Sequence, residues 1–264
     1  MSNAIRQYPT MIQSVDRAIR ILQALGGGPG RLGVSELSER LGLAKGTVHG
    51  LLRTLHSHGL VEQHAESDKY QLGPQLLQLS NRYLDLSELR VRALVWSDAL
   101  ATRADEAVRV GVFHGDGVLV VHHVFRPDTS LQILEVGALL PLHATALGKA
   151  VLAFAEQDVR QDLLQSKPPK LTGQTLVTAA ALGRELDSVR GRGYALEREE
   201  AVLGEAGVAA PVFDRHGAAI GAIGIAGPRE RVLARGRERT LGTAVIEAAR
   251  GISRDLGATG GPPV

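Results

Sequence analysis

Residues 34–63 read VSELSERLGLAKGTVHGLLRTLHSHGLVEQ, and this stretch decides the fold of the first part of the chain. Its apolar residues recur at helical spacing in two runs, which predict a short helix over residues 34–41 and a longer one over residues 44–57. Gly42 ends the first helix, so that only a short turn separates the two. Two short helices joined in this way are typical of a helix-turn-helix motif.

The residues on either side extend this motif to a complete domain. Residues 14–25 carry apolar side chains at helical spacing and predict a helix with Ser14 as its N-cap. Residues 60–63 and 70–73 are two short strand-like segments around a polar run, which is the pattern of a β-hairpin. A hairpin directly after a helix-turn-helix forms the wing of a winged-helix domain. We therefore predict a winged helix-turn-helix domain over residues 11–73.

The pattern changes twice after residue 73. Pro74 opens a helix that we interpret as a linker over residues 74–87, and residues 88–257 form a second domain. The predicted strands of that domain cover residues 107–114, 118–125, 131–137, 194–200, 207–214 and 219–227. The predicted helices cover residues 89–104, 145–154, 156–164, 179–192 and 232–256. Strands in hairpins with helices between them are typical of the α+β class, here with a mostly antiparallel sheet of about six strands.

Composition and charge narrow the class of protein. The 264 residues include no Cys, which excludes disulfides, thiolate metal sites and cysteine nucleophiles. The longest run without a charged residue, for example residues 136–148, is 13 residues, too short for a membrane span of about 20. The first residues do not resemble a signal peptide, so we expect a soluble, cytoplasmic protein with no membrane partner. Residues 1–61 carry seven basic and three acidic residues, an excess that favours an anionic partner.

The second predicted helix of the motif presents polar side chains away from its apolar face, as a DNA-reading helix does. The residues predicted to contact DNA are Arg17, Lys45, Gly46, Thr47, His49 and Arg53. The first turn of this helix and His49 would read base edges in the major groove, while the two arginines would contact phosphates. Gly46 would let the backbone approach the DNA closely. The alternative is an ordinary solvated helix face, against which the wing and the basic excess argue.

The sequence contains no complete catalytic motif. Residues 28–33 match GxGxxG but follow a helix and contain proline, which argues against a dinucleotide site. The run Gly148-Lys149-Ala150 lacks the other residues of a phosphate-binding loop, and no GxSxG occurs. His122 and His123 are adjacent in a strand, so they face opposite ways and chelate a metal poorly. We predict no catalytic residue, no metal and no cofactor, and an enzyme is the least favoured alternative.

One run in the second domain indicates a binding role. Residues 143–150 read HATALGKA, which places a turn and a helix start at residues 145–148. Free backbone N–H groups at a helix start can hold a carboxylate or a phosphate. The alternative is a plain helix start.

The chain resembles the IclR family of bacterial transcription regulators over residues 13–256. Five runs carry the resemblance: SVDRAIRIL, residues 34–63 as quoted above, PLHATALGKAVLA, RGYALEREE and GVAAPVFDRHGAAIGAIGIAGP. The resemblance implies a winged helix-turn-helix domain, a helical linker and a GAF-like effector-binding domain. It also implies a homodimer or a dimer of dimers on a palindromic double-stranded operator, with a small-molecule effector that changes operator affinity.

The resemblance also implies where the effector binds. The family positions that contact it are held here by Ala146, Leu147, Glu197, Gly207, Gly224 and Ala226. Better-known members carry Cys or hydroxyl side chains at the last three positions, so fewer polar groups and more room are expected here, together with a larger or differently anchored ligand.

Within the family, residues 41–55, 70–79, 89–101 and 118–128 resemble the subgroup that controls glycerol catabolism in actinomycetes. This implies a repressor released by glycerol 3-phosphate or glycerol, with the phosphate at the helix start and Glu197 on the hydroxyls. A regulator of aromatic-acid or other carboxylic-acid catabolism is the alternative within the family.

Overall fold

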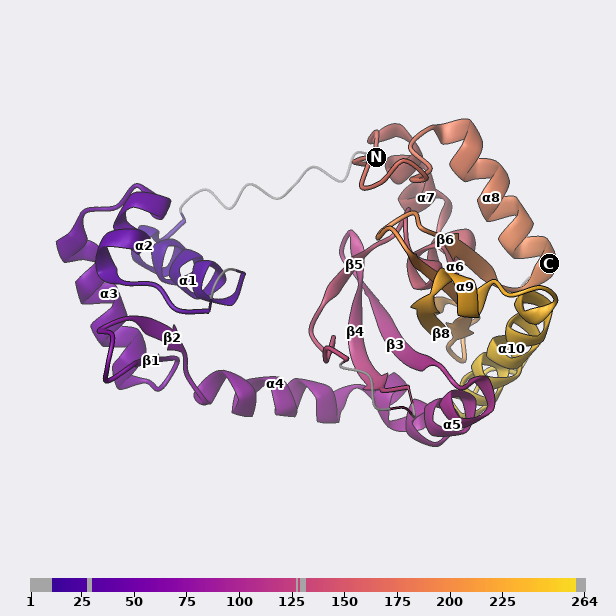
Figure 1. Ribbon diagram of the computed structural model, residues 1–264, viewed down its shortest axis with the longest axis horizontal. Helices are drawn as coiled ribbons and strands as arrows, with labels where there is room; N and C mark the ends of the chain where they lie inside the picture. The colour runs from indigo at the N-terminus through magenta and orange to yellow at the C-terminus, as the bar shows by residue number, and fades with distance from the viewer. Residues whose placement is uncertain (1–10, 28–29, 127, 129–131, 260–264) are drawn as a thin grey trace. The chain divides into compact units, whose positions relative to one another are not determined.

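The computed structural model describes residues 11–27, 30–126, 128 and 132–259. The chain divides into two compact units, Met1–Leu84 and Asp85–Val264 (Figure 1), called here the N-terminal and the C-terminal unit. No helix within the described ranges is both long and apolar enough to cross a membrane.

The N-terminal unit packs three helices against a short hairpin. Its elements are α1 (Gln13–Gly26), α2 (Val34–Leu41), α3 (Lys45–Ser57), β1 (Val61–Gln63), β2 (Tyr70–Leu72) and the start of α4 (Gln75–Leu86). β1 and β2 pair antiparallel, and Leu32 forms an additional bridge to Tyr70. The core is made of apolar residues of α1, α2, α3 and the hairpin. Ile21, Leu37 and Leu52 are fully buried in it.

The turn between α2 and α3 explains why this sequence forms a helix-turn-helix. Gly42 adopts φ 65°, a left-handed conformation that glycine tolerates and that ends α2. The Leu43 amide donates to the Ser38 carbonyl, and the Ser38 hydroxyl donates back to the Leu43 carbonyl at 2.6 Å. These bonds satisfy the end of α2 and fix the direction in which α3 begins.

The helix that follows the hairpin, α4, ends at Leu86, and Ser87 comes directly after it. This residue has φ −74° and ψ 97°, an extended conformation, and its hydroxyl caps α5 (Glu88–Ala104) by accepting a bond from the Arg90 amide. α4 and α5 are therefore two helices separated by a single extended residue.

The C-terminal unit is built on a six-stranded antiparallel sheet in the order β5-β4-β3-β8-β7-β6 (Figure 1). The strands are β3 (Ala107–His114), β4 (Gly117–Val124), β5 (Leu139–Pro141), β6 (Ala195–Arg198), β7 (Glu205–Phe213) and β8 (Ala219–Pro228). The helices are α5, α6 (Ala146–Phe154), α7 (Gln157–Gln165), α8 (Ala179–Arg192), α9 (Arg229–Val232) and α10 (Arg237–Asp255). This arrangement confirms the predicted α+β class with an antiparallel sheet.

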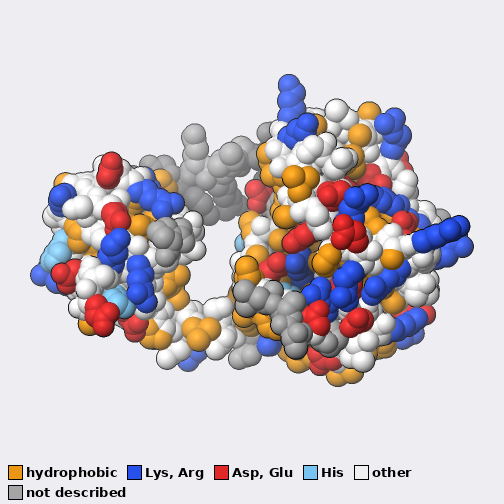
Figure 2. All heavy atoms as spheres, in the orientation of Figure 1, with side chains coloured by type: hydrophobic (Ala, Val, Ile, Leu, Met, Phe, Trp, Pro, Cys, Tyr) orange, Lys and Arg blue, Asp and Glu red, His pale blue; other side chains and the backbone are white. Residues whose placement is uncertain are grey.

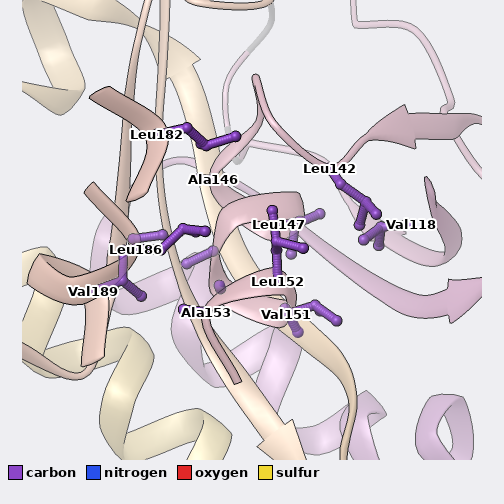
Figure 3. Packing of buried hydrophobic residues seen from close by; sticks show 14 residues of the cluster. Val118, Leu142, Ala146, Leu147, Val151, Leu152, Ala153, Leu182, Leu186 and Val189 are labelled. Carbon is purple, nitrogen blue, oxygen red and sulfur yellow. The ribbon is translucent and has the colours of Figure 1, made fainter. Parts of the chain in front are cut away.

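Helices cover both faces of the sheet. A Cβ on Gly221 of β8 would meet Leu89 of α5, whereas a Cβ on Gly207 of β7 would meet Ala146 of α6. α5 and α10 lie side by side on the first face (Figure 1). On the other face, Leu147 and Leu152 of α6 lie between Leu142 on one side and the α8 leucines on the other (Figure 3).

Three local predictions were wrong. Residues 132–137 are not a strand: Ile133 and Leu134 are 78% and 60% exposed, so a strand there would gain no burial, and the strand lies at Leu139–Pro141 instead. The closing helix is split into α9 and α10 because Gly236 adopts φ 80°. Ser14 is the second residue of α1, and the N-cap is Ile12.

Candidate DNA-binding surface and effector site

The predicted DNA-reading residues lie on the outer face of α3, with one on α1. Val48, Leu52 and Leu55 point into the core of the N-terminal unit, which turns the opposite face of α3 outward. Lys45, Gly46, His49 and Arg53 are exposed, and Thr47 is half-buried. Arg17 is half-buried on α1 and donates to the Gln13 side chain at 3.1 Å. Figure 2 shows blue Lys and Arg and pale blue His side chains on the surface of this unit.

The wing is tied to the helices by polar contacts. Lys69, beside β2, forms an ion pair with Glu36 of α2 at 2.9 Å, and Glu36 also accepts from the Gly33 amide at 2.6 Å. Arg31 donates to the Gln71 side chain at 2.9 Å. The hairpin is thereby held next to the start of α2.

Glycine at position 46 is not required by the packing of α3. A Cβ placed on Gly46 or on Gly50 would meet no atom within 4 Å, although glycine costs a helix about 1 kcal/mol relative to alanine. Two glycines on an open helix face leave the backbone accessible to a closely approaching partner.

Gly46→Ala is therefore expected to have opposite effects on stability and on DNA binding. The variant should stabilise the N-terminal unit by about 1 kcal/mol, measured by thermal unfolding, because alanine is the better helix former. It should weaken DNA binding about tenfold, since the methyl group separates the backbone from the DNA. Gly183→Ala is the matched control, because Gly183 lies in α8 with equally open space. Unchanged DNA affinity in Gly46→Ala would contradict close approach at this residue.

The predicted effector residues meet on the face of the sheet that α6 covers. Glu197 of β6 pairs with Gly207 of β7, which pairs with Ala226 of β8, and Gly224 pairs with Ala209 beside them. Directly paired residues of an antiparallel sheet share a face. A Cβ on Gly207 would lie 3.1 Å from the Ala146 Cβ and 3.5 Å from Glu197 Oε2. We call this set, Ala146, Glu197, Gly207, Gly224 and Ala226, the α6 face.

Two of the glycines leave less room than expected. A Cβ on Gly224 would lie 2.6 Å from the Ala209 Cβ and 2.9 Å from the Val208 carbonyl oxygen. At Gly207 the neighbouring Ala146 is almost as close. Glycine at position 224 is therefore required by the close approach of neighbouring atoms, whereas a Cβ at position 207 would need only a small shift of Ala146.

The start of α6 is capped by a side chain and has two amides without an acceptor in the helix. The Thr145 hydroxyl caps the helix by accepting from the Gly148 amide at 3.0 Å. The amides of Ala146 and Leu147, the first helical residues, have no acceptor within the helix. Leu147 also contributes its buried side chain to the core around α6.

Glu197 is the buried acid of the α6 face and lies on the edge strand β6. Its side chain is 7% exposed, and Oε1 accepts from the amides of Glu200 at 2.8 Å and Ala201 at 3.4 Å. Burial raises the pKa of Glu197 from 4.5 to about 7, against the lowering by those two amides, and the nearby Glu200 raises it further. Glu197 thus titrates close to neutral pH.

This pKa makes the stability of the C-terminal unit depend on pH. Between pH 4.5 and about 7 folded Glu197 keeps a proton that the unfolded chain has released, so stability falls as pH rises, by about 3 kcal/mol in all. Glu197→Gln removes this loss. We expect it to raise the melting temperature at pH 8 and to change it little at pH 5, followed by the fluorescence of Trp96, the only tryptophan. Equal shifts at both pH values would contradict the raised pKa.

A buried lysine, Lys149, lies near Glu197. The sequence-based prediction of the effector site did not include it. Lys149 of α6 is 1% exposed, and its Nζ lies 2.6 Å from Glu200 Oε1 and 3.7 Å from Glu185 Oε1. Arg192 contacts the same Glu185 oxygen at 2.7 Å. The sequence signal that could have found this pair is the single charged residue in the otherwise apolar α6. A lysine buried there needs a paired acid.

A second charged group lies on the same side of the sheet. Arg109 of β3 pairs in register with Gly224 on one side and with His123 of β4 on the other. Its Nη2 lies 2.7 Å from Glu135 Oε1 and its Nε 2.5 Å from Glu135 Oε2. Neither residue was predicted as part of a site.

Two cavities of the C-terminal unit lie elsewhere. One, of about 430 Å³, is lined by residues of α10, β7 and the end of α6, and another, of about 610 Å³, lies between the β3–β4 turn, β5 and α7. Neither is lined by the α6 face. Among the residues that the structure describes, no cluster of His, Asp and Glu could hold a metal ion.

A winged helix-turn-helix with an exposed polar reading helix, joined to a sensor-like α+β domain, defines a DNA-binding transcriptional regulator. Residues 14–65 match the IclR helix-turn-helix domain, and residues 81–254 match the C-terminal domain of bacterial IclR transcriptional regulators. The chain belongs to the IclR family. This confirms the predicted family and the prediction of a ligand-responsive regulator in place of an enzyme.

Individual relatives agree over nearly the whole chain. The chain is 52% identical over 248 residues to a glycerol operon regulatory protein of Streptomyces griseus, covering 94% of this chain and 97% of the relative. It is 49% identical, with the same coverage, to a glycerol operon regulatory protein of Streptomyces coelicolor. An IclR transcriptional regulator of Alicyclobacillus acidocaldarius has a similar structure, with a TM-score of 0.80 at 26% identity, covering 93% of this chain and 99% of that one.

Proposed function

We propose that the chain represses an operon for glycerol catabolism and leaves its operator when glycerol 3-phosphate, or glycerol itself, binds the α6 face. The observation that carries the proposal is the 52% identity over 94% of the chain to a glycerol operon regulatory protein. Since its partner is DNA, the protein acts in the cytoplasm.

The α6 face provides complementary groups for a phosphorylated polyol. The free amides at the start of α6 bind phosphate oxygens, as helix N-termini do. Glu197 Oε2, beside Gly207, accepts bonds from the hydroxyl groups. Leu147 and the small residues of β7 and β8 surround the carbon chain. Ligand binding regulates only if it favours one arrangement of the chain over another, and the helix α4 is the segment that joins the sensor to the DNA-binding domain.

On the DNA side, α3 enters a major groove. Lys45, Thr47 and His49 read base edges, and Gly46 allows the backbone to approach. Arg53 and Arg17 contact phosphates, so removing either should weaken binding to all sequences alike and reduce the salt dependence.

Exposed apolar side chains support a homodimer on a palindromic operator, or a dimer of such dimers. In α1 and the residues just before it, Met11, Ile12 and Val15 are 72%, 68% and 53% exposed. On α4, Leu77 is 64% and Leu79 54% exposed. Apolar patches of this kind mark interaction surfaces, and a two-fold dimer matches two half-sites related by the same symmetry.

The proposal is tested by fluorescence anisotropy with DNA from upstream of the protein's own gene. The protein is titrated alone and with glycerol 3-phosphate, glycerol, and a panel of aromatic and other carboxylic acids. We expect specific binding that glycerol 3-phosphate or glycerol weakens and the acids do not. Glu197→Ala is the matched variant, expected to bind the DNA normally and to respond less to the ligand.

Two results would decide against the proposal. Specific binding that only an aromatic or another carboxylic acid weakens would make the protein a regulator of acid catabolism. If the protein binds the upstream DNA no more tightly than a scrambled duplex, the proposal that it binds a specific operator is wrong.

A further inference from the structure

Arg109 of β3 lies on the same side of the sheet as the α6 face. It is in register with Gly224 of β8, and Gly224 is two residues from Ala226, which pairs with Gly207 and through it with Glu197. Directly paired residues share a face, and diagonal neighbours lie about 7–8 Å apart, within reach of a long side chain. An arginine on β3 can therefore reach a ligand held by β6, β7 and β8.

The guanidinium of Arg109 is occupied by a carboxylate of the same chain. Two nitrogens of Arg109 contact the two oxygens of Glu135, at 2.5 and 2.7 Å, and the side chains are 17% and 29% exposed. The Nη2–Oε1 contact is a hydrogen bond, whereas Nε and Oε2 lie close together without hydrogen-bond geometry. Arginine binds carboxylates and phosphates through ion pairs of this kind. Glu135 thus stands where the acidic group of a ligand would bind.

Apart from Arg109, Glu135 is held through its backbone, whose carbonyl accepts a hydrogen bond from the Ala138 amide at 2.9 Å. It lies in the non-helical, non-strand segment before β5, and its amide donates to His123 Nδ1 at 3.2 Å. Its neighbours Ile133 and Leu134 are largely exposed. Burial raises the pKa of Glu135 and Glu205 adds to the rise, although Arg109 opposes both. A more highly charged acid can therefore replace it.

Other groups near the α6 face are poorer anchors for an anion. Lys149 already pairs with Glu200 and Glu185 in the core. Burial lowers the pKa of His123 to about 4, so His123 is uncharged at neutral pH. The start of a helix supplies only about half a positive charge, whereas a phosphate monoester carries about −1.5 to −2.

We propose that Arg109 binds the acidic group of the effector and that Glu135 occupies Arg109 until the effector replaces it. The proposal rests on the effector site proposed above. It adds Arg109 as the positively charged group that binds the effector and Glu135 as the group of the same chain that competes with the effector for Arg109. The acidic group is a phosphate if the effector is glycerol 3-phosphate and a carboxylate if it is an organic acid. The internal pair makes the free protein selective, because a neutral ligand gains nothing from Arg109.

Isothermal titration calorimetry on the full-length protein tests the proposal, with glycerol 3-phosphate, glycerol and the carboxylic acids as ligands. Arg109→Gln should weaken binding of the acidic ligand about 10- to 100-fold, the value of one charged hydrogen-bonding group. Arg109→Lys, which keeps the charge and loses the paired geometry, should lie in between. Glu135→Gln should tighten binding about 3- to 10-fold, because the competitor loses its charge.

The opposite effects of Arg109→Gln and Glu135→Gln on ligand affinity distinguish this proposal from a purely structural role of the pair. If the pair only stabilised the fold, both variants would weaken binding and lower the melting temperature followed by Trp96. The double variant is the control: Glu135→Gln should bring no gain once Arg109 is Gln. Unchanged affinity in Arg109→Gln, or weaker binding in Glu135→Gln, would overturn the proposal.

The same titrations distinguish its failure from failure of the proposed function. A wild-type protein that binds an organic acid and not glycerol 3-phosphate overturns the glycerol effector, and the variants then test Arg109 with that acid. Binding of neutral glycerol alone, equally by wild type and Arg109→Gln, supports the glycerol operon and overturns the role of Arg109.

Discussion

Leu52→Ala is expected to abolish operator binding while the effector domain stays folded. Leu52 is fully buried in the core of the N-terminal unit, where removing a leucine side chain costs about 2–5 kcal/mol. That is a large share of the stability of a small domain, about 5–15 kcal/mol. Far-UV circular dichroism should show a helical transition lowered by at least about 10 °C, and anisotropy should show no specific DNA binding.

The single tryptophan makes this expectation specific to one unit. Trp96 lies in α5, where its indole donates to Asp255 at 2.8 Å, so its fluorescence reports on the C-terminal unit alone. Its melting curve should be unchanged in Leu52→Ala. Leu186→Ala, a fully buried leucine of α8, is the reciprocal control and should move the Trp96 transition instead. A Trp96 transition that moves equally in Leu52→Ala would mean that the two units unfold as one.

Lys149→Met is expected to destabilise the C-terminal unit by about 3–5 kcal/mol. Removing one partner of a buried ion pair leaves the other charge unpaired in the core, and here the unpaired group is Glu200, whose side chain is 8% exposed. The Trp96 melting transition should fall accordingly. The fall should be smaller at pH 5 than at pH 8, because burial raises the pKa of Glu200 and a protonated Glu200 carries no charge.

Adding Glu200→Gln to Lys149→Met supplies the control. The double variant has no uncompensated charge at position 200, so it should recover a large part of the lost stability and of its pH dependence. A double variant no more stable than Lys149→Met would show that the loss comes from packing around α6 and not from the charge.

The sequence predicted most elements because their signals are local. The helix-turn-helix follows from apolar spacing and from Gly42, which was predicted to end α2 and does so in a left-handed conformation. The strands of the hairpins follow from alternation and from short turns. Where apolar alternation was not matched by burial, at residues 132–137, the prediction of a strand was wrong.

The sequence predicted only part of the site, because no single segment indicates how two strands pair in register. Glu197, Gly207 and Ala226 could be named from the family resemblance, and the register places them side by side. Arg109 and Glu135 are 26 residues apart, and nothing in either segment alone indicates that they form a pair. The same holds for Lys149 and Glu200, which are 51 residues apart.

Ser87 has a mechanical consequence. α4 contains 12 residues and is therefore about 18 Å long, and a single extended residue connects it to α5. The direction of this rod relative to α5 is set by the two dihedral angles of one residue. A rotation of about 10° there moves the far end of α4 by about 3 Å, roughly the rise of two helical residues. Any rotation at Ser87 would therefore produce a larger displacement at the far end of α4 than at the end beside α5.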